Sequence, residues 1–339
     1  MTNLGFYNYY PVYNNNRMFD PAIQAPMGDD LLYPFHHLAE VAREQGVSVS
    51  TIDTGPLDTY DAIIFLDFPG RHNRYFKRLT GMNHKNLYLL LFENETIKQD
   101  NWEKENYQHF KKVFTWRDDI VDNKKIFKFF LPNKIPDSIY FDIRGKKNFC
   151  CLIAGNKKNH HPLELYSERI QAIRWFEENR PALFDLYGKG WNLTLPRYLS
   201  PFKPVLRLVY QVFFPRYPSY RGEITSKREI LKQYRFSICY ENARDIPGYI
   251  TEKIFDCFFA GCVPVYLGAP NVTDYIPESC FIDKRKFPDY SELFSYLNTM
   301  PEDKYLDYVH AIEEFIKSEK IIPFGADYFA DIILNELDA

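Results

Sequence analysis

Two hallmarks of membrane and secreted proteins are missing from this sequence. No run of residues approaches the roughly twenty apolar positions that a membrane-spanning helix needs, and residues 1–10 lack a basic segment followed by an apolar one. We therefore expect a cytoplasmic protein. A formal net charge of -3 gives no general attraction for nucleic acid, so we expect no nucleic-acid partner.

Motifs typical of two enzyme classes are also missing. A dinucleotide-dependent oxidoreductase would show Gly-x-Gly-x-x-Gly after its first strand, where this chain has FYNYY at residues 6–10. The chain contains no Asp-x-Asp motif, with which single-domain nucleotide-sugar transferases hold a divalent ion. Its six cysteines lie inside apolar patterns without the spacing of metal ligands. We expect buried thiols, no metal site and no cofactor.

The first half of the chain alternates short apolar runs with helical patterns, as in a Rossmann-like βαβ series. The patterns predict strands over 4–9, 47–52, 62–68, 87–92, 113–116 and 127–130, and helices over 29–45 and 71–81. A length of 339 residues suits two domains of about 150 residues each. The Pro- and Lys-containing stretch 132–147 looks like the connection between them.

The second half repeats the α/β alternation. We predict strands over 149–154 and 182–187 and a helix over 164–179, and we place the domains at 1–147 and 148–339. The last helix is a candidate for packing back on the first domain. The second strand leads into Gly188-Lys189-Gly190, where glycines would let the backbone approach a phosphate and Lys189 could pair with its charge.

The stretch 234–281 is the most informative part of the sequence. Residues 235–240 read as a strand, 241–248 as a polar loop, and Thr251 as the N-cap of a helix that Gly261 closes. A helix N-terminus attracts anions, and Lys253 adds a full charge there. Tyr249 could stack on a ring or donate its hydroxyl to a phosphate. Glu252 would repel phosphate, unless it faces a sugar that develops positive charge.

A second group of acids follows a predicted strand of the first half. In doubly wound sheets ligands bind beyond the carboxyl ends of strands, which draws attention to Glu93, Asn94 and Glu95 after residue 92. Burial at a cleft can raise the pKa of a glutamate and suit it for removing a proton from a hydroxyl. Glu93 is therefore a candidate general base.

An ordered series of motifs in the second half resembles the α-1,3-fucosyltransferases of glycosyltransferase family 10. The series is FSICYEN at 236–242, YITEK at 249–253, GCVPVYLGAP at 261–270, YIP at 275–277 and CFI at 280–282. The resemblance is patchy in the first half. It implies a GT-B fold, in which two Rossmann-like domains face across a cleft, together with GDP-fucose as donor, inversion at the sugar carbon and a β-linked glycan acceptor.

The resemblance also implies roles for particular residues. Lys189, Tyr249 and Lys253 would neutralise the departing diphosphate, Asn242 would help position the donor, and Glu252 would support the cationic sugar. Lys189 stands where the family usually has an arginine, a change that keeps the charge but loses bidentate geometry.

The segment containing Glu93 looks like the one that carries the family's catalytic glutamate. Glu95 is the alternate base if the alignment shifts by two residues. The predicted activity is inverting α-1,3 or α-1,3/4 transfer of L-fucose to a glycan hydroxyl, on N-acetylglucosamine or a related sugar of a surface polysaccharide or lipopolysaccharide. The alternatives are a transferase for another GDP-sugar and a binding protein of the same fold without turnover. The sequence identifies neither acceptor-binding residues nor the oligomeric state.

The segment 196–220 combines arginines and lysines with bulky apolar residues between two prolines. One interpretation is a short helix on the inner face of an anionic membrane, which would bring the enzyme to a lipid-linked glycan. The other is an insertion whose apolar residues pack on the second domain.

Overall fold

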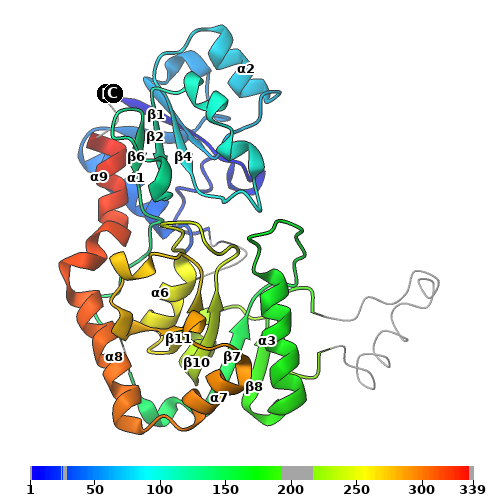
Figure 1. Ribbon diagram of the computed structural model, residues 1–339. Coiled ribbons are helices and arrows are strands. Elements are labelled where there is room, and N and C mark those ends of the chain that lie inside the picture. The colour runs from blue at the N-terminus through cyan, green and yellow to red at the C-terminus, as the bar shows by residue number, and fades with distance from the viewer. Residues whose placement is uncertain (1, 24, 26–28, 140, 192–216, 336–339) are drawn as a thin grey trace, which may run out of the picture.

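The computed structural model describes residues 2–23, 25, 29–139, 141–191 and 217–335. Two six-stranded sheets organise the chain, and every strand pair in both is parallel. Figure 1 shows the two halves one above the other, with helices against the sheets. This architecture confirms the predicted α/β class. The segment 196–220 lies outside the described residues as far as residue 216.

The first unit is built on the sheet β2-β1-β3-β4-β5-β6. Its strands are β1 (Asn3–Tyr7), β2 (Ser48–Thr51), β3 (Ala62–Leu66), β4 (Leu87–Leu91), β5 (Lys112–Thr115) and β6 (Ile126–Lys128). Helices α1 (Tyr33–Glu44) and α2 (Arg74–Gly81) connect the early strands. Strands β3 and β4 are buried along their whole length, which explains why both read as continuous apolar runs.

The second unit is built on the sheet β12-β11-β10-β7-β8-β9. Its strands are β7 (Asn148–Ile153), β8 (Phe184–Tyr187), β9 (Tyr220–Gly222), β10 (Tyr234–Tyr240), β11 (Val263–Leu267) and β12 (Ile282–Asp283). The helices are α3 (Tyr166–Asn179), α5 (Lys227–Leu231), α6 (Glu252–Phe259), α7 (Tyr290–Asn298), α8 (Glu302–Lys317) and α9 (Ala326–Asn335). The predicted domain boundary falls at the start of β7.

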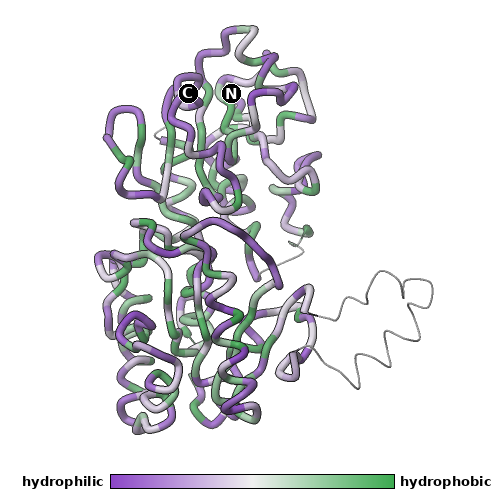
Figure 2. The backbone as a smooth tube through the Cα atoms, turned by 45° about the vertical axis from the view of Figure 1, so that its right-hand side comes forward, coloured by the Kyte–Doolittle hydropathy of each residue, from purple (hydrophilic) through white to green (hydrophobic). Residues whose placement is uncertain are grey.

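Apolar side chains fill the interior of both units. Figure 2 shows hydrophobic stretches running through the sheets and hydrophilic loops around them. All six cysteines are buried free thiols, as predicted. Among the described residues no helix combines the length and the apolar character needed to cross a bilayer.

The predicted helix over 29–45 begins later than expected, at Tyr33. Pro34 occupies its first turn, where a residue without an N–H and with fixed φ is best tolerated. The preceding Asp29 instead accepts hydrogen bonds from Ser226 Oγ at 3.0 Å and from the backbone N–H of Arg228 at 2.8 Å. These contacts tie the first unit to the start of α5.

Helix α9 returns to the first unit after the chain has completed the second. It lies beside α1, and the rings of Phe329 and Phe35 meet edge to face with centroids 5.4 Å apart (Figure 1). This returning helix therefore joins the two units in addition to the chain connection between β6 and β7.

A polar cluster around Asp118 also joins the two units. The carboxylate of Asp118 accepts hydrogen bonds from Tyr275 Oη at 2.6 Å and Asn271 Nδ2 at 2.9 Å, both from the second unit. Gly248 fits against the same cluster with φ of +79°. A Cβ there would lie 2.3 Å from the carbonyl oxygen of Trp116. The close approach therefore requires glycine.

Asp67 fixes the carboxyl ends of β3 and β4 from within the first unit. It is 3% exposed, and its Oδ1 accepts from the backbone N–H groups of Phe92 and Glu93 at 2.8 and 3.0 Å. Asn101 Nδ2 donates to the same oxygen at 2.7 Å. Burial raises the pKa of Asp67 to about 6, although these hydrogen bonds oppose the shift.

This raised pKa predicts that Asp67 weakens the fold as pH rises. Its carboxyl group binds a proton more tightly in the folded chain, so its favourable contribution is complete below about pH 4 and is lost through pH 6. We expect the free energy of unfolding of the wild type, relative to Asp67→Asn, to fall by up to about 3 kcal/mol between pH 4 and pH 7. Urea unfolding of both proteins measures this difference. A difference that does not change with pH would contradict the assignment.

Candidate active site

The start of helix α6 forms the centre of the site. Thr251 is the N-cap, as predicted, and its Oγ1 accepts from the backbone N–H of Lys253 at 3.5 Å. At the other end Gly261 has φ of +59°, and its N–H donates to the carbonyl of Phe258. The N–H of Cys262 donates to Cys257, which completes a Schellman motif. The helix is thus fixed at both ends by local sequence.

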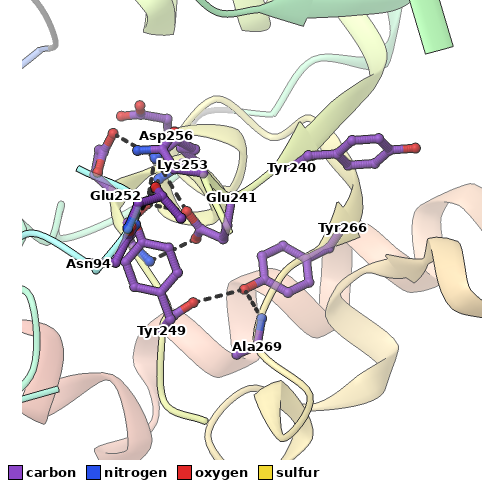
Figure 3. A network of polar contacts seen from close by, with 12 residues as sticks. Asn94, Tyr240, Glu241, Tyr249, Glu252, Lys253, Asp256, Tyr266 and Ala269 are labelled. Carbon is purple, nitrogen blue, oxygen red and sulfur yellow. Dashed lines mark hydrogen bonds and ion pairs between the residues drawn. The ribbon is translucent and has the colours of Figure 1, made fainter. Parts of the chain in front are cut away.

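A fully buried carboxylate, Glu241, orients this helix start. It follows β10 and is 0% exposed. Its two oxygens accept from the backbone N–H and the Oγ1 of Thr251, at 2.9 and 2.7 Å. Lys253 Nζ lies 3.3 Å from Glu241 Oε2 (Figure 3). The buried charge is therefore both hydrogen-bonded and paired, as a charge without water must be.

Glu252 lies between two lysines. Its Oε1 is 3.5 Å from Lys253 Nζ and 3.6 Å from Lys227 Nζ, and Lys227 also contacts Asp256 at 2.7 Å. Burial disfavours the ionised form of Glu252, but the two lysines outweigh it and lower its pKa to about 2. The side chain keeps 39% of its surface exposed. Glu252 is thus a permanent negative charge that a ligand can reach.

Arg169 of α3 supports the other side of the β10 loop. Its guanidinium is buried and donates to the carbonyl oxygens of Tyr240 and Glu241 at 2.6 and 2.7 Å. It also donates to Asn242 Oδ1 at 3.1 Å. Asn242, predicted to position a donor, is therefore itself held in place by a buried cation.

Glu93 lies in the first unit, just beyond β4, where Asp67 holds its backbone N–H. Tyr10 Oη donates to Glu93 Oε1 at 2.9 Å. Glu95, the alternate base, is held differently, because Arg117 Nη1 donates to both of its oxygens at 3.2 and 3.3 Å. Glu95 is therefore paired with the positively charged Arg117, whereas Glu93 contacts the neutral hydroxyl of Tyr10.

Tyr249 lies near acidic residues of both units, Glu93 in the first and Glu241 and Glu252 in the second. It is buried, and its ring packs on Trp116 of the first unit with centroids 4.6 Å apart. Burial raises the pKa of the Tyr249 hydroxyl, and Glu241, Glu93 and Glu252 raise it further. The phenol therefore lies within the electrostatic reach of carboxylates from both units. Because the protein covers this ring, it cannot stack on a ligand.

Lys189 follows a strand of the second sheet at the same edge as the loop after β10, but two strands away from it. Its turn is tight, because a Cβ on Gly188 would lie 2.1 Å from the carbonyl oxygen of Ala154. Lys189 follows β8, and β7 separates that strand from β10. Two strand spacings amount to roughly 10 Å. Lys189 therefore lies two strands away from the loop that follows β10.

Several residues of this site were not predicted from the sequence. They are Tyr10, Asp67, Arg169, Lys227, Glu241 and Asp256. Asp67 and Glu241 each follow a buried strand directly, which is the same signal that pointed to Glu93. The other four act through contacts with residues distant in sequence, and no local pattern marks them.

Comparison with curated proteins finds fucosyltransferases. The chain is 37% identical over 90 residues to the α-(1,3)-fucosyltransferase FucT of Helicobacter pylori, a match that covers 26% of this chain and 18% of that protein. It is 37% identical over 91 residues to human GDP-fucose protein O-fucosyltransferase 3, covering 26% of this chain and 19% of that protein. The matched stretches thus span about a fifth of these relatives.

Solved structures with the same fold include glycosyltransferases of different specificity. An α1,3-fucosyltransferase crystallised with GDP superimposes with a TM-score of 0.53 at 15% identity, over 92% of this chain and 82% of that one. An α-glucosyltransferase in complex with UDP-glucose and DNA gives 0.58 at 11% identity, over 98% and 99% of the two chains. These similarities confirm the predicted GT-B fold.

The family comparison covers the part of the chain that contains most of the site. The model described as "Glycosyltransferase family 10 (fucosyltransferase) C-term" matches residues 143–320, just over half of the chain. This range includes Lys189, Asn242, Tyr249, Glu252 and Lys253, and it leaves out Glu93. The resemblance seen in the motifs is thereby confirmed, and the chain belongs to glycosyltransferase family 10, the fucosyltransferases.

Proposed function

We propose that this protein transfers L-fucose from GDP-fucose to a glycan hydroxyl with inversion at the sugar carbon. One observation carries the proposal. Tyr249 lies just before α6 and packs its ring on Trp116 of the first unit, and burial together with carboxylates from both units, Glu93 and Glu252, raises the pKa of its hydroxyl. Family membership supplies the donor class, and a solved α1,3-fucosyltransferase of this fold was crystallised with GDP.

We place the donor diphosphate at the positive end of α6. Lys253 is held beside Glu252 and Glu241, which raise its pKa although burial opposes the shift, so its charge persists at neutral pH. Lys189 would meet the more distant end of the nucleotide, and Asn242 would position it. The Tyr249 hydroxyl would donate to a diphosphate oxygen. Fixed cations and donors of this kind stabilise a leaving group without reorganising during the reaction.

Glu252 would stabilise the sugar as it becomes positively charged. A carboxylate whose pKa lies near 2 remains ionised at neutral pH, so it cannot serve as a proton donor there. Electrostatic support of an oxocarbenium-like sugar is the role that such a fixed charge can perform. Lys227 and Lys253 keep it ionised beside an anionic donor.

Glu93 would remove the proton from the attacking hydroxyl. Its contact with Tyr10 leaves one carboxylate oxygen for the acceptor, and Asp67 fixes the backbone that carries it. Glu95 is a weaker candidate, because Arg117 already engages both of its oxygens. The acceptor would bind on the first unit and the donor on the second, so that the reacting groups meet between them.

We consider two kinds of acceptor. The first is N-acetylglucosamine or a related sugar of a surface polysaccharide or lipopolysaccharide, fucosylated by α-1,3 or α-1,3/4 transfer, and the H. pylori relative is named for α-(1,3) transfer. The human relative is named as a protein O-fucosyltransferase, which makes a protein hydroxyl the second candidate. Hydrolysis of GDP-fucose would distinguish either enzyme from a binding protein without turnover, and a panel of GDP-sugars would test the donor.

Replacing Glu93 tests the general base. We expect Glu93→Gln to lower transfer by roughly 10²–10⁴-fold, because the amide cannot accept the hydroxyl proton. GDP affinity should stay at the wild-type level, because the nucleotide binds to the other unit. Glu95→Gln is the matched control and should keep transfer of the same order as the wild type. Normal turnover in Glu93→Gln, or a loss confined to Glu95→Gln, would refute the assignment.

Replacing Lys253 tests the diphosphate site. Lys253→Ala should weaken GDP binding by about 1.5–3 kcal/mol, the range for a lost hydrogen bond to a charged group. Isothermal titration calorimetry with GDP measures the change. Lys232→Ala, which removes a lysine paired with Glu229 beside α5, should bind GDP as the wild type does. Equal affinity in all three proteins would exclude Lys253 from the site.

We also propose that cationic side chains hold the leaving diphosphate without a metal ion. Transfer should then persist in EDTA, because Lys253 and Lys189 supply the charge that Mn²⁺ or Mg²⁺ provides in other transferases. Initial rates before and after exhaustive chelation measure this. Loss of activity that only a divalent ion restores would show that the proposal is wrong.

A further inference from the structure

Lys227 contacts the acids at the start of α6 from a helix that the first unit holds in place. It is the first residue of α5, and its Nζ lies 2.7 Å from Asp256 Oδ2 and 3.6 Å from Glu252 Oε1. Glu252 and Asp256 lie one turn apart on α6, so one lysine bridges both carboxylates (Figure 3). A displacement of Lys227 therefore changes the surroundings of Glu252.

Helix α5 is too short to hold Lys227 by itself. It spans five residues, Lys227–Leu231, and isolated helices shorter than about 12 residues are marginal in water. Within the second unit Ser226 caps its start, with Oγ accepting from the backbone N–H of Glu229 at 3.2 Å. A helix start leaves further N–H groups without partners inside the helix, and these need acceptors from elsewhere.

The first unit supplies an acceptor on both sides of Lys227. Asp29 Oδ2 accepts from Ser226 Oγ at 3.0 Å and from the backbone N–H of Arg228 at 2.8 Å. Ser226 precedes Lys227 and Arg228 follows it, so the two hydrogen bonds flank the lysine. Asp29 thus fixes the backbone from which the Lys227 side chain reaches α6.

Asp30 connects the same contact to the chain between the two units. Its Oδ2 accepts from Arg228 Nη2 at 2.9 Å, and its Oδ1 lies 3.5 Å from Nζ of Lys134, a residue between β6 and β7. The backbone of Asp30 has φ of +56°, in the left-handed region that few residues with a Cβ adopt. Surrounding contacts must hold such a conformation. A change in the docking of the two units therefore reaches the start of α5.

The charges at this contact depend on one another. Burial lowers the pKa of Lys227, but Asp256 and Glu252 outweigh this effect and raise it, so the lysine stays charged. Burial raises the pKa of Asp256, Lys227 opposes the rise, and Glu252 and Asp29 add to it. Lys227 is thus the cation that balances two acids of α6, and the field of Asp29 extends to that helix.

We propose that Asp29 is a positioning residue for the donor site and acts through Lys227 on Glu252. The inference rests on the proposed function, because it takes Glu252 as the group that supports the cationic sugar. Docking of the first unit on α5 places Lys227, and Lys227 fixes the carboxylate of Glu252. The affinity for GDP does not depend on this contact, because Glu241 holds Lys253 from within the second unit.

The test is a double-mutant cycle on the full chain, with release of GDP from GDP-fucose as the measured reaction. Lys227→Gln removes the charge but keeps a donor for Asp256, and Asp29→Ala removes the contact with α5. Each should lower kcat about tenfold, because small displacements of a group that acts on the substrate have effects of this size or larger. The double variant should also lose about tenfold and not about a hundredfold, since Asp29 acts only through Lys227.

Controls separate this positioning role from general damage to the fold. Asp58→Ala removes an exposed carboxylate of the first unit and should turn over as the wild type does. Calorimetry should find wild-type GDP affinity in every variant, whereas a damaged second unit would lose affinity together with kcat. Ser226→Ala is a milder variant, in case Asp29→Ala does not fold. It should lower kcat less, and its effect should disappear in the Lys227→Gln background.

Glu252→Gln is measured in parallel and closes the same cycle if Lys227→Gln does not fold. Asp29→Ala should have no further effect in this background. The positioning role alone is refuted if Glu252→Gln loses activity while the effects of Asp29→Ala and Lys227→Gln multiply, or while Asp29→Ala keeps the wild-type kcat. A wild-type rate in Glu252→Gln, or no release of GDP by the wild type, would instead refute the proposed function.

Discussion

The site depends on the way in which one buried carboxylate, Glu241, fixes the start of α6. Because Glu241 is removed from water, it must be fully satisfied, and Thr251 and Lys253 satisfy it. These contacts set the direction of the first helical turn and thereby the position of Glu252. Gly268 makes room for the arrangement, since a Cβ there would lie 2.5 Å from Glu241 Cγ. The geometry of the candidate donor site thus follows from one buried charge.

Side chains of opposite charge lie close together around the start of α6. The acidic residues are Glu241, Glu252 and Asp256, and the basic residues beside them are Lys227, Lys253 and Arg169. Such a network suits a reaction in which an anion leaves and a cation forms, because a fixed group of either sign is ready for each. Such a network makes the stability of the fold sensitive to substitution, because a buried ion is stable only while every partner is in place.

Much of the fold and part of the site could be predicted from the sequence. Buried strands such as β3 and β4 read as apolar runs, and Thr251 and Gly261 marked the ends of α6 by their local chemistry. The short strands β9 and β12 were missed, since three or two residues carry no measurable alternation. Tyr10 was also missed. Its contact with Glu93 spans 83 positions and exists only once the sheet has formed.

The choice between Glu93 and Glu95 shows why local pattern was insufficient. Both follow β4 within four residues, and the sequence could rank them only by resemblance. The structure separates them by their partners, Tyr10 for Glu93 and Arg117 for Glu95. What decides the role of a carboxylate is its three-dimensional environment, and that information lies in residues far along the chain.

The most direct test of this account is a crystal structure of the protein with GDP-fucose. We expect the diphosphate at the start of α6 with Lys253 Nζ in contact, and the fucose ring facing Glu252 with its anomeric carbon open toward Glu93. A nucleotide bound away from α6, or a sugar turned away from the first unit, would contradict the central claim.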